Sequence, residues 1–177
     1  TDRGQMHLLK VLDLPYGRFR DKGTPIDNLS NYNSSEENLV YIAPMADIRQ
    51  KKLLFGTKTA MLKLVSGAEF DVAKRTTAAT KLNEGDMVLF VHPVAESDHI
   101  VMQSAKDMFL RIEAGTIPEK KKGAVGVRGM RLASGDQLEA IYLLREEDEP
   151  VSVRIKDKEV VLNRLHVANR DTKGVKR

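Results

Sequence analysis

The residues of this chain whose types and spacing could support a function are basic. A cation follows two mostly apolar residues at Lys10, Lys63, Arg111 and, more loosely, Arg164, and these cations are 53, 48 and 53 residues apart. Side chains of a strand alternate between its two faces, so each cation is expected to point outward while its apolar neighbours point into a core. A single such cation is ordinarily no more than part of a solvated surface. The fourfold recurrence favours a stripe that can neutralise phosphates.

A basic loop follows each of these cations after about ten residues. Phe19 is the only aromatic residue within these loops, which disfavours the stacking platforms that bind single-stranded nucleic acid. The candidate phosphate-contacting residues are Lys10, Arg18, Arg20, Lys22, Lys63, Lys74, Arg75, Arg111, Lys120, Lys121, Lys122, Arg128, Arg131, Arg164, Arg170, Lys173, Lys176 and Arg177.

The elements that must position these cations repeat with a period near 50 residues. The Gly85-Asp86 turn stands 50 residues before the Gly135-Asp136 turn. Self-similarity at this length is typical of propellers, solenoids and arrays. Apolar segments separated by short turns predict three hairpins, at residues 53–65, 100–112 and 151–167.

The same patterns predict the remaining strands. Residues 137–148 also have helical spacing, but they stand where 87–91 stands in the repeat before, which favours a strand. The other expected strands are 5–14, 26–29, 39–43, 77–82, 87–91 and 125–132.

We therefore predict an all-β, propeller-like fold in a single domain, 1–177. The repeats are expected at approximately 1–50, 51–98, 99–149 and, in part, 150–177. The first and last units each lack a strand of the pattern, so the chain is expected to be a fragment of a longer array.

Composition narrows the class of protein. The 177 residues include 41% hydrophobic and 31% charged residues, with a net charge of +4, which is typical of a soluble globular protein. No apolar run has the length of a membrane helix, and the N-terminal residues do not resemble a signal peptide, so no membrane partner is expected. The absence of cysteine excludes a thiol nucleophile and fits a cytoplasmic location.

No set of residues predicts an enzyme site. The four histidines have no convincing ligand spacing, so no metal site is expected. Gly123, Gly126 and Gly129 precede strand and turn patterns rather than a helix, which argues against a phosphate-cradling loop. These glycines are expected to allow positive φ angles or close packing.

One segment carries a family resemblance. The order of hairpin, basic loop, Gly126-Val127-Arg128-Gly129, Arg131-Leu132 and Gly135-Asp136 resembles a blade of the C-terminal domain of bacterial type IIA topoisomerase A subunits. Those are the A subunits of DNA gyrase and topoisomerase IV. Residues 58–65 with 80–91, and 4–10 with 23–29, are similar more loosely. The resemblance covers nearly the whole chain at the level of the repeat.

The resemblance implies a β-pinwheel of four-stranded antiparallel blades, about three and a half repeats of it here, with strands exchanged between neighbours. It implies that duplex DNA lies on the basic outer rim and that the chain is non-catalytic. The partners implied are the parent topoisomerase's cleavage domain and its ATPase B subunit in the nucleoid, with ATP and Mg used by the parent enzyme. No cofactor is expected in this chain.

Two departures from the family pattern bear on these expectations. The gyrase box (glutamine, two basic residues, two glycines, lysine, glycine) is only echoed at 18–23 and 170–174, which leaves both gyrase and topoisomerase IV open as the parent. No tyrosine follows an arginine, as the cleavage tyrosine of the family does. The competing hypothesis is a protein-interaction propeller whose cations only keep it soluble.

Overall fold

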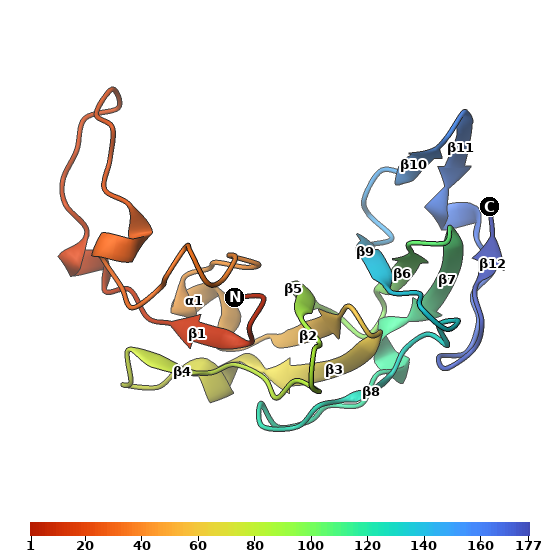
Figure 1. Ribbon diagram of the computed structural model, residues 1–177, viewed down its shortest axis with the longest axis horizontal. Coiled ribbons are helices and arrows are strands. Elements are labelled where there is room, and N and C mark those ends of the chain that lie inside the picture. The colour runs from red at the N-terminus through yellow and green to blue at the C-terminus, as the bar shows by residue number, and fades with distance from the viewer.

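The computed structural model describes residues 1–177 as an open arc of antiparallel sheets (Figure 1). Two four-stranded sheets form the middle of the arc, one with the order β5-β2-β3-β8 and the other with the order β9-β6-β7-β12. Two-stranded sheets flank them, β1 with β4 and β10 with β11. The strands are β1 (Gln5–His7), β2 (Lys52–Thr57), β3 (Met61–Ser66), β4 (Thr76–Ala78), β5 (Val88–Val94), β6 (His99–Ser104), β7 (Met108–Glu113), β8 (Val127–Arg128), β9 (Leu138–Leu144), β10 (Ser152–Ile155), β11 (Lys158–Val161) and β12 (Val175–Lys176).

Helical structure is confined to short turns. The α-helix α1 (Met45–Ile48) is four residues long. A helix that crosses a membrane needs several times that length, and no helix here approaches it. The 3₁₀ turns are η1 (Val11–Asp13), η2 (Ile26–Asn28), η3 (Gly67–Phe70), η4 (Ala114–Thr116) and η5 (Leu162–Arg164).

Each four-stranded sheet takes its last strand from the following repeat. The β2–β3 hairpin is extended by β8, which follows the β6–β7 hairpin in the chain, and β7 is extended by β12, which follows the β10–β11 hairpin. The pairing of β1 with β4 has the same form. Figure 1 shows β4, β8 and β12 on the convex side of the arc, with β5 and β9 on the concave side. We call the convex side formed by β4, β8 and β12 the exchanged edge.

The sheets stack face to face through apolar side chains. Leu54, Leu62 and Leu64 of the first sheet meet Ile100 and Ile112 of the second in the largest buried cluster. Strand residues between them point the other way: Leu53, Phe55 and Val65 pack with Phe70 and Ile48 on the opposite face of the first sheet. This alternation is what the period of two predicts for strands buried on both faces.

The predicted all-β, four-stranded pinwheel architecture is confirmed, and so are all three hairpins. Residues 138–144 form a strand, as their place in the repeat indicated, in spite of their helical spacing. Five expected strands differ. The strand expected at 5–14 ends at His7, residues 26–28 make a 3₁₀ turn after Pro25, and residues 39–43 have no regular structure, although Val40 and Tyr41 pack against the core. The strands expected at 77–82 and 125–132 are shorter, as β4 and β8.

Candidate nucleic-acid interface

The exchanged edge brings three of the four predicted basic loops into equivalent places. Residues 74–75 come immediately before β4, residues 120–122 precede β8, and residues 170–173 precede β12. Because these strands pair in the same way with β1, β3 and β7, the loops before them lie at corresponding positions along the convex side (Figure 1). We call these three segments the basic loops.

Most of the candidate cations are exposed to solvent. Lys122, Arg111 and Arg170 are half-buried, and Lys63 is buried. The exposed ones are Lys10, Arg18, Arg20, Lys22, Lys74, Arg75, Lys120, Lys121, Arg128, Arg131, Arg164, Lys173, Lys176 and Arg177.

Glu69, in the η3 turn after β3, shapes the middle basic loop. Its carboxylate accepts the backbone N–H of Lys122 at 2.9 Å and lies 3.4 Å from the ammonium of Lys121. Burial opposes ionisation of Glu69, but these two lysines hold the pKa of its carboxyl below the usual value. The Lys122 ammonium donates to the backbone oxygen of Glu69 at 3.1 Å and so is turned inward. Lys120 and Lys121 remain the cations that this loop presents.

Lys63 does not point outward, so this part of the predicted stripe is wrong. Its side chain is 1% exposed, and its ammonium donates to the backbone oxygens of Lys121 (3.3 Å), Lys122 (2.7 Å) and Ala124 (2.6 Å). The same ammonium lies 5.5 Å from the ring centre of Phe55. Lys63 in this position binds the protein's own backbone and is not available to contact a phosphate.

Arg111 is also engaged internally. Its guanidinium donates to the backbone oxygens of Asn163 and Leu165, and its Nε contacts His99 Nδ1 at 2.8 Å. Arg111 therefore joins the second sheet to the segment that follows β11.

The strand registers explain why Lys63 and Arg111 are not equivalent positions of the two hairpins. Met61 of β3 pairs with Arg128, and Met108 of β7 pairs with Lys176, so equivalent residues of the two hairpins are 47 apart. Lys63 is thus equivalent to Leu110, and Arg111 to Leu64. The sequence spacing of 48 differs by one residue, and a shift of one residue moves a side chain to the opposite face of a strand.

The buried ammonium of Lys63 gives a testable pH dependence. Burial lowers the pKa of Lys63 from 10.5 to about 8, and the nearby Glu69 carboxylate opposes this shift. The folded chain holds this proton less tightly than the unfolded chain, so the cost of the buried charge is fully present below pH 8 and is relieved as the pH rises toward 10.5. Relative to Lys63→Met, the native chain should gain up to about 3 kcal/mol in free energy of unfolding over that range. Denaturant titrations of both chains at several pH values measure it, and a difference that does not change with pH would contradict it.

The basic loop before β12 contains a carboxylate that the sequence pattern does not single out. Asp171 lies 3.5 Å from the guanidinium of Arg128 and 3.8 Å from that of Arg131, and Arg170 donates to the backbone oxygen of Arg128 at 3.4 Å. Both Arg128 and Arg131 stay more than half exposed, which keeps them accessible to a further anion. The only local signal for Asp171 was its place inside a basic cluster.

The fourth basic cluster is not on the exchanged edge. Arg18, Arg20 and Lys22 lie on an arm that Figure 1 shows rising away from the sheets at the N-terminal end of the arc. Tyr16 and Phe19 on this arm are 96% and 104% exposed. The structure therefore does not bring these three cations together with the basic loops.

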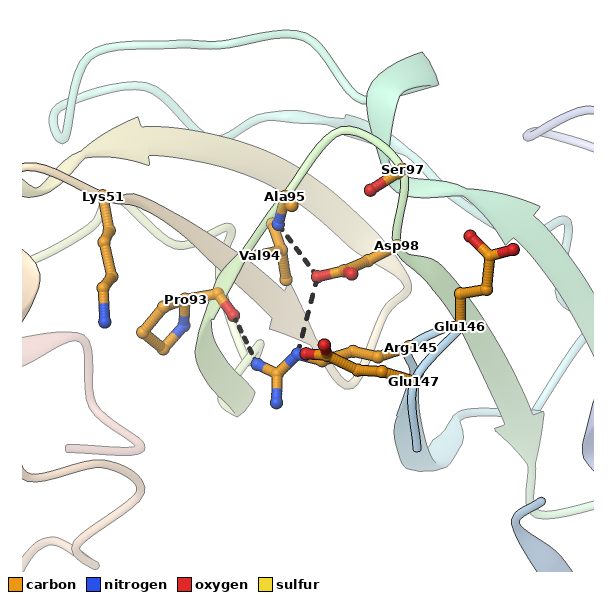
Figure 2. Close-up of a pocket in the computed structure, with 9 residues that line it drawn as sticks. All are labelled: Lys51, Pro93, Val94, Ala95, Ser97, Asp98, Arg145, Glu146 and Glu147. Carbon is orange, nitrogen blue, oxygen red and sulfur yellow. Dashed lines mark hydrogen bonds and ion pairs between the residues drawn. The ribbon is translucent and has the colours of Figure 1, made fainter. Parts of the chain in front are cut away.

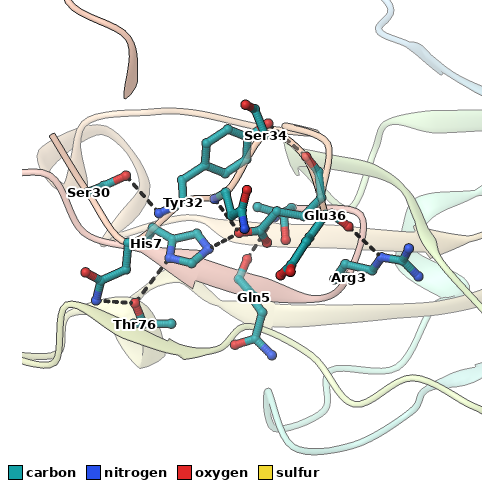
Figure 3. A network of polar contacts seen from close by, with 12 residues as sticks. Arg3, Gln5, His7, Ser30, Tyr32, Ser34, Glu36 and Thr76 are labelled. Carbon is teal, nitrogen blue, oxygen red and sulfur yellow. Dashed lines mark hydrogen bonds and ion pairs between the residues drawn. The ribbon is translucent and has the colours of Figure 1, made fainter. Parts of the chain in front are cut away.

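The connection after the arm is fixed to β1 and β4 by a polar network (Figure 3). His7 contacts Glu37 at 2.8 Å through Nε2 and the hydroxyl of Thr76 at 3.2 Å through Nδ1. Tyr32 donates its hydroxyl to the backbone oxygen of Glu37, and Arg3 donates to that of Glu36. This network gives His7 a structural role.

Acidic residues gather on the other side of the arc. Glu146 and Glu147 follow β9, the strand on the concave side, and line an open pocket of about 660 Å³ (Figure 2). In it Arg145 contacts the Asp98 carboxylate at 3.8 Å and donates to the backbone oxygen of Pro93 at 3.4 Å. The acidic segment Glu146–Glu147 thus follows a concave-side strand and does not belong to the exchanged edge.

Comparison with known proteins gives a family match over the two four-stranded repeats. The model of the family described as "DNA gyrase C-terminal domain, beta-propeller" matches residues 51–95 and 98–145, more than half of the chain.

Curated relatives match over most of this chain but only part of theirs. The DNA gyrase A subunit of Lawsonia intracellularis is 29% identical over 99% of this chain and 22% of that protein. The DNA gyrase A subunit of Escherichia coli is 26% identical over 82% of this chain and 17% of that protein. The chain therefore spans about a fifth of the length of these relatives.

Solved structures support the fold. The C-terminal domain of a DNA topoisomerase IV superimposes with a TM-score of 0.88 at 23% identity, over 97% of this chain and 55% of that one. A DNA gyrase A C-terminal domain superimposes with a TM-score of 0.74 at 20% identity, over 98% of this chain and 57% of that one.

Proposed function

The chain belongs to the DNA gyrase C-terminal domain family, and on this basis we propose that it binds duplex DNA along the exchanged edge as a non-catalytic part of a type IIA topoisomerase. The observation that carries the proposal is the placement of the basic loops. Three successive repeats each present exposed cations in the segment before the exchanged strand, on the convex side of one arc. A row of exposed cations on a convex surface suits a bent duplex whose phosphates face the protein.

The contacts available are of the kind that positions DNA without reading its sequence. Lys74, Arg75, Lys120 and Lys121 are exposed side chains, and no exposed aromatic residue lies among them. Such cations bind phosphates and carry no base information. Smooth bending of a 20–30 base-pair site costs on the order of 1–6 kcal/mol, so contacts from several repeats must combine to offset it.

In the proposed setting the chain assists an enzyme whose chemistry lies elsewhere. Its proposed partners are the cleavage domain of the parent and the parent's ATPase B subunit. ATP and Mg are used by the parent. By holding a duplex on the exchanged edge, the domain would direct which segment of DNA undergoes strand passage.

Salt dependence tests the proposal directly. The affinity of the chain for a duplex of about 40 base pairs should fall steeply with salt, with a slope of log K against log salt of roughly −4 to −8 if about five to nine phosphates are contacted. Fluorescence anisotropy between about 50 and 200 mM KCl measures this slope. An affinity that does not change with salt, or no binding at low salt, would favour the protein-interaction propeller instead.

A further inference from the structure

Lys63 links two repeats at the middle basic loop. The residue belongs to β3 of the first sheet, whereas the three carbonyls that its ammonium contacts belong to residues 121–124, which follow the β7 hairpin of the next repeat. The loop therefore takes its shape from a side chain of the repeat before it.

The hydrogen bonds of the Lys63 ammonium use all of its donors. A lysine ammonium has three N–H donors, and here three backbone oxygens lie within 3.3 Å of it. A buried carbonyl without a donor lowers the stability of the fold. The Lys63 ammonium therefore stabilises the loop backbone in the conformation that turns these three oxygens inward. Neighbouring bonds fix the start of the same loop, since Lys120 donates its N–H to the Leu64 oxygen at 2.8 Å and Leu64 donates to the Pro118 oxygen at 3.1 Å.

This conformation of the loop backbone determines which of the loop's lysine side chains face the solvent. With its carbonyls turned toward Lys63, the loop leaves Lys120 exposed and the Lys121 side chain 88% exposed. Lys63 lies beneath the loop and is 1% exposed, so it has no surface with which to contact a phosphate.

We propose that Lys63 is a positioning residue for duplex binding, which holds the loop of the following repeat in the shape that presents Lys120 and Lys121 and does not itself touch DNA. The inference rests on the proposed function for its effect on binding. Its structural part, the fixing of the loop by Lys63, stands independently and is tested separately.

The structural part is tested by amide hydrogen exchange. In Lys63→Met, which keeps an unbranched side chain but has no donor, the amides of Lys120, Lys122 and Ala124 should exchange at least about tenfold faster, because the loop loses three hydrogen bonds. The amides of β6 and β9 should be unchanged. Lys51→Met, at an exposed position beside the concave-side pocket of Figure 2, is the matched control. Unchanged exchange in the loop would overturn the proposal.

The functional part is tested by a double-mutant cycle on duplex affinity. Lys63→Met should weaken binding about fivefold in the native background, and by less than about 1.5-fold when Lys120 and Lys121 are already glutamine. A loss that persists undiminished in the second background would show that Lys63 acts through general stability, and would overturn the positioning role. No loss in either background would overturn it too.

A second variant keeps the proposal testable if Lys63→Met does not fold. Glu69→Gln leaves Lys63 and Phe55 in place but weakens the other anchor of the loop, so the amide of Lys122, which loses its charged acceptor, should exchange faster. If the native chain does not bind duplex at low salt, the proposed function fails, while faster loop exchange in Lys63→Met would still establish the link between the repeats.

Discussion

A chain in which four exposed lysines of the basic loops are replaced by glutamine is expected to bind duplex DNA at least about 100-fold more weakly at about 100 mM salt. The slope of log K against log salt should flatten by about three to four, because each lost phosphate contact removes about 0.9 from it. The four lysines are Lys74, Lys120, Lys121 and Lys173. Titration of a labelled duplex at several salt concentrations measures both quantities.

The matched control removes the same charge from other places. Lys58, Lys106 and Lys156 stand at the tips of the three hairpins, and Lys51 precedes β2. Their replacement by glutamine lowers the net charge equally but leaves the exchanged edge intact. The affinity of this control chain for duplex DNA should fall less than about fivefold. Equal losses in the two chains would mean that only net charge matters, and the row of loops on the convex side would have no special role.

Replacing Gly126 by alanine is expected to lower the free energy of unfolding by about 2–4 kcal/mol. Gly126 immediately precedes β8 and has a φ of +108°, and a Cβ built there would lie 2.5 Å from the backbone oxygen of Leu62 in β3. The backbone would have to move away from β3, so the exchanged strand would lose its pairing through Met61 and Leu62. Urea denaturation gives the change in stability, and hydrogen exchange shows whether the loss is greatest at β8.

Gly123, three residues earlier in the same loop, provides the control. A Cβ at Gly123 meets nothing within 4 Å, and its φ is not in the left-handed region. Gly123→Ala should therefore change stability by less than about 0.5 kcal/mol. If the two alanine variants are equally stable, close approach of β8 to β3 is not what the glycine supplies.

These glycines also show what sequence can and cannot predict. The prediction that they serve positive φ angles or close packing is confirmed at Gly126, and at Gly129, whose Cβ would meet Leu62 at 2.4 Å. It does not apply to Gly123. Glycine-rich sequence indicates that the backbone needs freedom somewhere in a loop, but only the neighbouring strand determines at which residue.

The repeat and the hairpins could be predicted because their signals are local. Apolar alternation and short turns mark β2 with β3 and β6 with β7 directly, and the period of 50 residues assigned 138–144 to a strand against its helical spacing. The face of Lys63 could not be predicted in this way. It depends on a register of 47 rather than 48 residues, which the hydrogen bonds between strands determine and which insertions in loops obscure.

The contacts of Glu69 and Asp171 could not be predicted for a similar reason. Each carboxylate contacts a cation far away in the sequence: Glu69 contacts Lys122 at a separation of 53 residues, and Asp171 contacts Arg128 at a separation of 43. Composition showed an excess of cations, and only the fold shows which of them are paired.

Strand exchange also constrains the order in which the chain can fold as it leaves the ribosome. The first four-stranded sheet gains β8 only at residues 127–128, about sixty residues after β3 ends at Ser66. Until then the nascent β2–β3 hairpin has an unpaired edge strand, which can pair with other strands, including the same hairpin of a neighbouring chain. Each four-stranded sheet is therefore completed only after the following repeat has been synthesised, so a pause in translation between the repeats would prolong the most aggregation-prone stage.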